Sequence, residues 1–193
     1  MQLLDLVLKV RELYVSELRR TIDDRKLSLP AFVSELLIEP SGSHPEDPDI
    51  YRVFRIDMIS GGRENPTLSD LNIDSYVSFD PFETTFGRLC MQISPFHWYA
   101  LECRFLIYEQ AFAPFETWAR TWLDPEDRRP RDAHGLQGVI HSVTRPELRN
   151  HHWITSIDFG SAPVSAFVEL LNAFQVMNVT SLEISTSFGV DHN

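Results

Sequence analysis

The chain has few basic residues, two cysteines and no long apolar run, and each shortage narrows what it can be. Lys and Arg number 17 against 28 Asp and Glu in 193 residues, so the formal net charge is -11. Nucleic acids and anionic membranes recruit clustered Lys and Arg, so neither is expected as a partner. No apolar run reaches the length of about 20 residues that a membrane-spanning helix needs.

The N-terminal apolar stretch lacks the features of a signal peptide. Asp5 interrupts it within the first turn, and no basic region precedes it. We therefore expect a cytoplasmic protein.

Cys90 and Cys103 are the only cysteines, and their spacing fits no zinc motif. In the strands expected around them, Cys103 shares a face with apolar residues, whereas Cys90 points to the other side. We predict two free thiols, with Cys103 in the core and no disulfide between them.

Signatures of catalysis and cofactor binding are also missing. No glycine-rich nucleotide-binding pattern, no G-x-S-x-G turn and no metal-ligand spacing of histidines occurs. His152 and Asp158 share an expected strand but are separated by about 20 Å, too far for a hydrogen bond. The register of His141 against His152 stays open, so an enzyme that uses these histidines is an alternative. We otherwise predict no catalytic residue, no cofactor and no metal site.

Helical periodicity marks the N-terminal segment, residues 1–26. Apolar residues recur at helical spacing from Leu3 to Ile22, with charged residues at other positions. We expect a long helix that packs on the domain, or an arm that packs on a second subunit. Residues 31–38 fit a helix or a strand equally well.

The rest of the chain predicts strands followed by two strand-strand-helix units. Ser161 is the expected N-cap of the second unit's helix. The strand before that helix and the strand after it form a βαβ unit, so they are expected to run parallel. The expected elements are strands at 50–60 and 75–82, hairpin 88–107 with helix 114–123, hairpin 137–159 with helix 162–177, and strand 181–188.

These elements predict a single α+β domain over residues 1–193. Its mixed, largely antiparallel sheet should have about five to seven strands, with helices mainly on one face. In sequence order we expect the N-terminal helix over 1–26, strands and a hairpin over 50–107, and helix, hairpin, helix and strand over 113–193.

Acidic and aromatic residues mix between residues 64 and 87, where Lys and Arg are absent. Carboxylates steer the approach of a basic partner and aromatic rings anchor interfaces, so this stretch is a candidate binding surface. The alternative is that the acids are only solvated and the rings belong to the core. The predicted partner-binding residues are Glu64, Asp70, Asp74, Tyr76, Asp80, Phe82 and Glu83.

Together these patterns favour a non-enzymatic protein that binds another, basic protein. A concrete form is an immunity or antitoxin-type protein that neutralises a basic effector or toxin through its acidic surface. An alternative is an oligomeric assembly subunit that associates through the N-terminal helix, and a homodimer is compatible with that helix.

Overall fold

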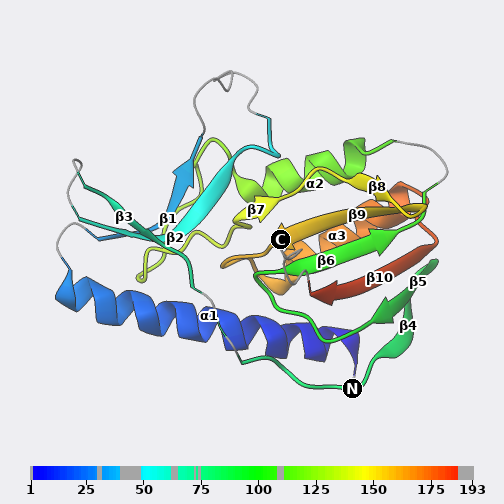
Figure 1. The fold of residues 1–193 in the computed structure, drawn as a ribbon, viewed down its shortest axis with the longest axis horizontal. Helices are drawn as coiled ribbons and strands as arrows, with labels where there is room; N and C mark the ends of the chain where they lie inside the picture. The colour runs from blue at the N-terminus through cyan, green and yellow to red at the C-terminus, as the bar shows by residue number, and fades with distance from the viewer. Residues whose placement is uncertain are drawn as a thin grey trace.

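The structure, a computed structural model, has an α+β fold with a long N-terminal helix (Figure 1). It describes residues 2–29, 32–39, 49–61, 65–71, 73, 75–107 and 111–186. Within these residues the chain forms three helices, a three-stranded sheet and a seven-stranded sheet. The predicted α+β class is confirmed, although the sequence pattern predicted one sheet. None of the described helices is long and apolar enough to cross a membrane.

Helix α1 (Leu3–Ser28) lies along both sheets and buries its apolar stripe against them (Figure 1). Leu6, Val10 and Leu18 are among its buried residues. Arg11 fixes the helix to the turn before α3 (Val164–Val176), since its guanidinium donates to the carbonyl of Ala162 at 2.7 Å. The helix therefore packs on its own chain, as the first of the two expectations had it.

The three-stranded sheet joins β1 (Val33–Ile38), β2 (Phe54–Ser60) and β3 (Thr67–Ser69), all antiparallel and in that order. Its first strand resolves the ambiguity of the segment after α1 in favour of a strand. The second strand begins later than predicted because Asp49 folds the chain into a turn. The Asp49 carboxylate accepts the amide of Tyr51 at 3.2 Å, and its carbonyl accepts the amide of Arg52 at 2.9 Å.

The seven-stranded sheet is mixed, and its order along the path is β4-β5-β10-β6-β9-β7, with β8 also paired to β9. Among the described strands of this sheet only β10 and β5 pair in parallel; the other pairs are antiparallel. The strands are β4 (Phe82–Phe86), β5 (Leu89–Ile93), β6 (Leu101–Phe105), β7 (Ser142–Val143), β8 (Glu147–Arg149), β9 (His152–Asp158) and β10 (Ser181–Thr186).

The predicted hairpin over residues 88–107 is wrong, because β10 lies between β5 and β6. The connection after β5 is not a tight turn. It buries Phe96 and Trp98, and the amide of His97 donates to the hydroxyl of Thr186 at the end of β10, at 2.8 Å. The true hairpin joins β4 to β5, so the strand expected to end at Pro81 instead begins after it.

The predicted direction of β9 and β10 is confirmed. Both run antiparallel to β6, which lies between them, so they are parallel to each other. The first predicted strand-strand-helix unit keeps its order, β5, β6 and α2, without being a hairpin. The second differs from the prediction, because three strands, β7, β8 and β9, precede α3. Both cysteines are free thiols, with Cys103 buried and Cys90 exposed, as predicted.

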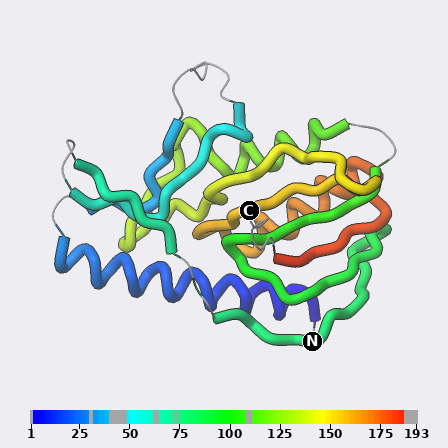
Figure 2. The backbone as a smooth tube through the Cα atoms, in the orientation of Figure 1, coloured from blue at the N-terminus to red at the C-terminus, as the bar shows by residue number. Residues whose placement is uncertain are grey.

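Helices α2 (Ala113–Leu123) and α3 cover one face of the seven-stranded sheet (Figures 1 and 2). The ring of Phe105 on β6 lies 4.9 Å from that of Phe174 on α3, and Trp118 on α2 donates to the carbonyl of Ala166 at 2.9 Å. The buried strand residues face these helices. No helix among the described residues covers the opposite side, which we call the open face.

Candidate functional site

The predicted partner-binding residues do not gather in one place. Tyr76 and Asp80 are exposed in the irregular stretch before β4, Glu83 is exposed on β4, and Phe82 is half-buried. Asp70 is exposed just after β3, and Figure 1 shows β3 and β4 at opposite ends of the molecule. Glu64 and Asp74 lie outside the described residues.

The open face is acidic where the structure describes it. Strand alternation places on it the side chains opposite to the buried ones. Both of its arginines are already paired, Arg104 with Glu183 at 3.9 Å and Arg149 with Glu147 at 2.6 Å. The carboxylates that alternation and register place on this face are Glu83, Glu102, Glu147, Asp158 and Glu183.

A hollow of about 360 Å³ lies on this face over β4, β5 and β10. Register sets Glu83 and Glu183 on either side of Gln92, so two carboxylates flank one amide across three strands. Thr85 and Ser181 line the same hollow with hydroxyl groups. Among the described residues no cation pairs with Glu83, so the hollow suits a basic side chain supplied from outside.

A second hollow, of about 350 Å³, separates the two sheets and holds Asp70 and Asp158. The side chain of Asp158 is 27% exposed and accepts the amide of Gly160 at 2.8 Å. Burial, chiefly, and the charge of Asp57 raise the pKa of Asp158 to about 7 against the influence of His141. Burial and Asp57 likewise raise the pKa of Asp70.

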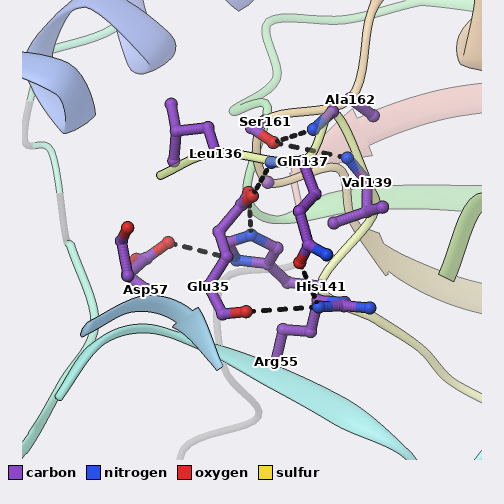
Figure 3. A network of polar contacts seen from close by, with 12 residues as sticks. Glu35, Arg55, Asp57, Leu136, Gln137, Val139, His141, Ser161 and Ala162 are labelled. Atoms are coloured by element: carbon purple, nitrogen blue, oxygen red, sulfur yellow. Dashed lines mark hydrogen bonds and ion pairs between the residues drawn. The ribbon is translucent and has the colours of Figure 1, made fainter. Parts of the chain in front are cut away.

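Next to this second hollow, which we call the groove, His141 lies buried between two carboxylates (Figure 3). Its Nε2 is 2.8 Å from the Glu35 carboxylate on β1, and its Nδ1 is 3.1 Å from the Asp57 carboxylate on β2. Asp158, on β9, is 4.0 Å from Nδ1. The cluster therefore joins the two sheets through one imidazole ring.

The cluster holds the ring as an imidazolium. Burial opposes its charging, but hydrogen bonds to Asp57 and Glu35 outweigh burial and hold the pKa of His141 well above 6.5. Burial also opposes ionisation of Asp57, yet the bonds from His141, from the amide of Leu71 and from the Tyr14 hydroxyl lower its pKa. The Leu71 amide is 2.7 Å away and the Tyr14 hydroxyl 3.0 Å away.

The chemistry left to His141 is narrow. Each ring nitrogen faces a carboxylate and the side chain is 1% exposed, so no lone pair is free for a metal or a substrate proton. Within the described ranges no group of three or more His, Cys, Asp or Glu is placed to hold a metal ion. His141 therefore acts as a structural cation. Of the cluster only Asp158 lines the hollow between the sheets, together with Asp70.

Glu35 has an unusual backbone and a fully buried side chain. Its φ is +47°, in the left-handed region that is costly for residues other than glycine. Both carboxylate oxygens are used, one by His141 and the other by the amide of Gln137. These bonds specify the strained conformation.

A buried arginine supports the back of the cluster (Figure 3). The guanidinium of Arg55 on β2 is fully buried and bonded at every nitrogen. This ties the first sheet to the loop after α2. Its acceptors are the carbonyls of Glu35, Leu123 and Asp124, the side-chain amide oxygen of Gln137 and the carboxylate of Asp127, at 2.7–3.2 Å.

Gly160 permits the close approach of His141. It has φ +46°, and a Cβ there would lie 2.1 Å from Cδ2 of the imidazole. Gly138 also has positive φ, +68°, but its Cβ would meet nothing closer than 3.9 Å. Both glycines thus have a left-handed backbone, but only at Gly160 would a side chain collide with a neighbouring residue.

We expect Gly160→Ala to destabilise the chain more than Gly138→Ala. Both changes carry the left-handed penalty of about 1–2 kcal/mol, but only the first displaces a ring held by two carboxylates. In urea unfolding, the free energy of unfolding of Gly160→Ala should be lower than that of Gly138→Ala by about 1–3 kcal/mol, which is the usual cost of overpacking a core. Equal losses in the two variants would show that the ring moves away freely.

Sequence reasoning missed this cluster. The expected separation of His152 and Asp158 is confirmed, since they lie at opposite ends of β9. The spacing along one strand said nothing of His141, which precedes β7 and lies 4.0 Å from Asp158. Consequently His141 and His152 do not meet. The predicted cap is also wrong: α3 begins at Val164, and the Ser161 hydroxyl accepts the amides of Gly138 and Val139 at 2.9 and 3.3 Å instead.

The remaining histidines form no site in the described chain. The ring of His97 contacts that of Tyr99 in a tilted arrangement, with centroids 5.1 Å apart, and His134 pairs with Asp23 on α1 at 3.0 Å. His151 is exposed at the end of the β8–β9 hairpin. His44 and His192 fall outside the described residues.

Comparison of the chain with protein-family models, with curated proteins and with solved structures yields no match.

Proposed function

We propose that this chain is a non-enzymatic cytoplasmic protein that binds a basic protein on the open face of its seven-stranded sheet. The observation that carries the proposal is the excess of carboxylates on a face that no described helix covers, together with the paired state of its arginines. Such a field steers a basic partner toward the face and speeds its association.

The docking surface centres on Glu83 and Glu102, which have no cation partner among the described residues. Glu83 and Glu183 flank the hollow over β4, β5 and β10, where a Lys or Arg side chain of the partner would find two carboxylates and an amide oxygen. This moves the expected surface from the 64–87 stretch to the sheet, with Glu83 belonging to both.

A basic toxin or other effector is the partner class that fits this charge. An immunity or antitoxin-type protein works by occupying such an effector, and it needs complementarity rather than catalytic groups. Such a function needs no catalytic histidine, which agrees with a His141 that is buried and holds the two sheets together.

Charge reversal tests the proposal. We expect immobilised wild-type chain to retain a basic protein from the native cell, and Glu83→Lys with Glu102→Lys to slow its association about tenfold at low salt. Glu126→Lys is the matched control, because Glu126 is exposed in the loop after α2, outside the open face. Equal association rates for all three proteins, or retention of no basic protein, would reject the surface.

A second candidate function is acid–base catalysis in the groove between the sheets. It is favoured by one observation, the partly exposed Asp158 with its pKa raised to about 7. Mutations distinguish the two candidate functions, because turnover in the groove would need Asp158, whereas docking on the sheet needs Glu83 and Glu102.

A further inference from the structure

Strand β4 is the edge of the seven-stranded sheet and is free on its outer side among the described residues. Its inner side forms the hairpin with β5, in which Thr85 lies opposite Cys90 and Glu83 opposite Gln92. An unpaired edge presents backbone donors and acceptors that can pair with another strand.

The hydrogen bonds of β5 show which groups of β4 point outward. The amide of Cys90 donates to the carbonyl of Thr180, at 3.0 Å, on the side of β10. Cys90 therefore forms a non-hydrogen-bonded pair with Thr85, and the same alternation applies to Gln92 and Glu83. The amide and carbonyl of both Glu83 and Thr85 consequently face away from β5.

We propose that two copies of this chain associate through antiparallel pairing of their β4 strands, about a twofold axis at Thr84. The pairing sets Glu83 of one copy opposite Thr85 of the other, and both residues carry outward backbone groups. Each such pair exchanges two hydrogen bonds, and symmetry supplies the second pair. This dimer proposal does not depend on the function proposed above.

The side chains of β4 match in this register. Phe82 comes opposite Phe86 of the second copy, in the closer type of cross-strand pair, where aromatic rings stabilise an antiparallel sheet. Both rings are half-buried in the single chain and would lose further exposure. Glu83 meets a threonine, so the register brings no two carboxylates directly opposite each other.

Charge complementarity supports the same register at both ends of the strand. Arg88 lies in the turn just after β4 and Asp80 lies two residues before β4, so the antiparallel register brings Arg88 of one copy to the end of the strand where Asp80 of the other copy lies. Both side chains are exposed, and no ion pair of either occurs among the described residues. Each twofold contact would therefore gain two Arg88–Asp80 pairs, one at each end.

The pairing extends the seven-stranded sheet across the axis, so the open faces of the two copies become one surface. A five-residue edge is small for a dimer interface, so we expect an equilibrium in the micromolar range. This places self-association on β4 rather than on α1, whose apolar stripe is buried in its own chain.

Sedimentation equilibrium between about 1 and about 300 µM tests the pairing. Thr85→Pro removes an outward amide without removing one that faces β5, and edge strands tolerate such a proline. We expect it to raise the dissociation constant about thirtyfold, because symmetry removes two hydrogen bonds. Thr85→Ala keeps the amide and is the matched control, with a change below about twofold.

A charge swap tests the register independently of any effect of proline on folding. Arg88→Asp should weaken the dimer about fivefold, and adding Asp80→Arg should restore it. Wild-type chain that stays monomeric to the highest concentration would overturn the proposal. So would a dimer that Thr85→Pro leaves unchanged, or a charge swap that restores nothing.

Discussion

Replacing His141 with glutamine should lower the free energy of unfolding by about 3–5 kcal/mol. The substitution removes the cation between Glu35 and Asp57, whose side chains are 0% and 3% exposed. Two buried carboxylates then face each other without compensation, and a buried charge without a partner is among the costliest defects in a folded protein. Urea unfolding at pH 7, with an unchanged slope against urea, measures the loss.

Two further variants separate this cause from a general effect of the substitution. His152→Gln changes a half-buried histidine at the end of a hairpin and should cost less than about 0.5 kcal/mol. Adding Asp57→Asn to His141→Gln should recover part of the loss, because one uncompensated charge disappears. A loss below about 1 kcal/mol in His141→Gln alone would mean that the imidazole is not the cation of the cluster.

Stability of the wild-type chain should fall as pH rises from 7 to 8.5. The pKa of His141 is held well above 6.5 in the folded chain, so the folded state keeps a proton that the unfolded state has released. Stability from a raised histidine pKa is fully present below the unfolded value and disappears as pH rises through the folded one. Linkage limits the slope from this one proton to at most about 1.4 kcal/mol per pH unit.

Asp158 changes stability in the same direction near the lower end of this window. Its pKa of about 7 is raised, so the proton it binds in the folded chain is lost as pH passes 7. Asp57, whose pKa is lowered, acts only in acid, where its contribution is lost as pH falls. Urea unfolding at several pH values measures the sum, and a stability that stays level or rises from pH 7 to 8.5 would contradict a charged His141.

The cluster explains how two sheets from distant parts of the chain form one body. Glu35 on β1, Asp57 on β2 and Asp158 on β9 converge on the imidazole of His141. The hydroxyl of Tyr14 on α1 adds a hydrogen bond to Asp57. Arg55 continues the connection to the loop after α2. The proposed docking surface on the sheet is thus held in place by buried ion pairs and hydrogen bonds.

Local periodicity was enough to predict α1, α3 and β9, because each shows its buried face in its own residues. Pairing between strands was not predictable in the same way. The parallel pairing of β10 with β5 joins residues about ninety positions apart, and no short-range pattern signals it. The result was a false hairpin between β5 and β6, whose loop looked short but carries the buried Phe96 and Trp98.

The candidate site residues were likewise predictable only where the signal is local in the sequence. Glu83 was predicted as a partner-binding residue from local acidity, and it does face solvent on the open face. Glu102 and Glu183 were not predicted, since only the sheet brings them beside it. Glu35 and His141 are 106 residues apart, and sequence offered one weak signal, a histidine inside the apolar run before β7.

Carboxylate footprinting of the captured complex tests the central claim most directly. Carbodiimide labels exposed Asp and Glu, and mass spectrometry compares the labelling of each residue in the free and bound chain. If a basic protein docks on the open face, Glu83 and Glu102 will lose most of their labelling on binding, while Glu126 keeps its own. Protection of Glu126, with Glu83 and Glu102 still labelled as in the free chain, would contradict the account.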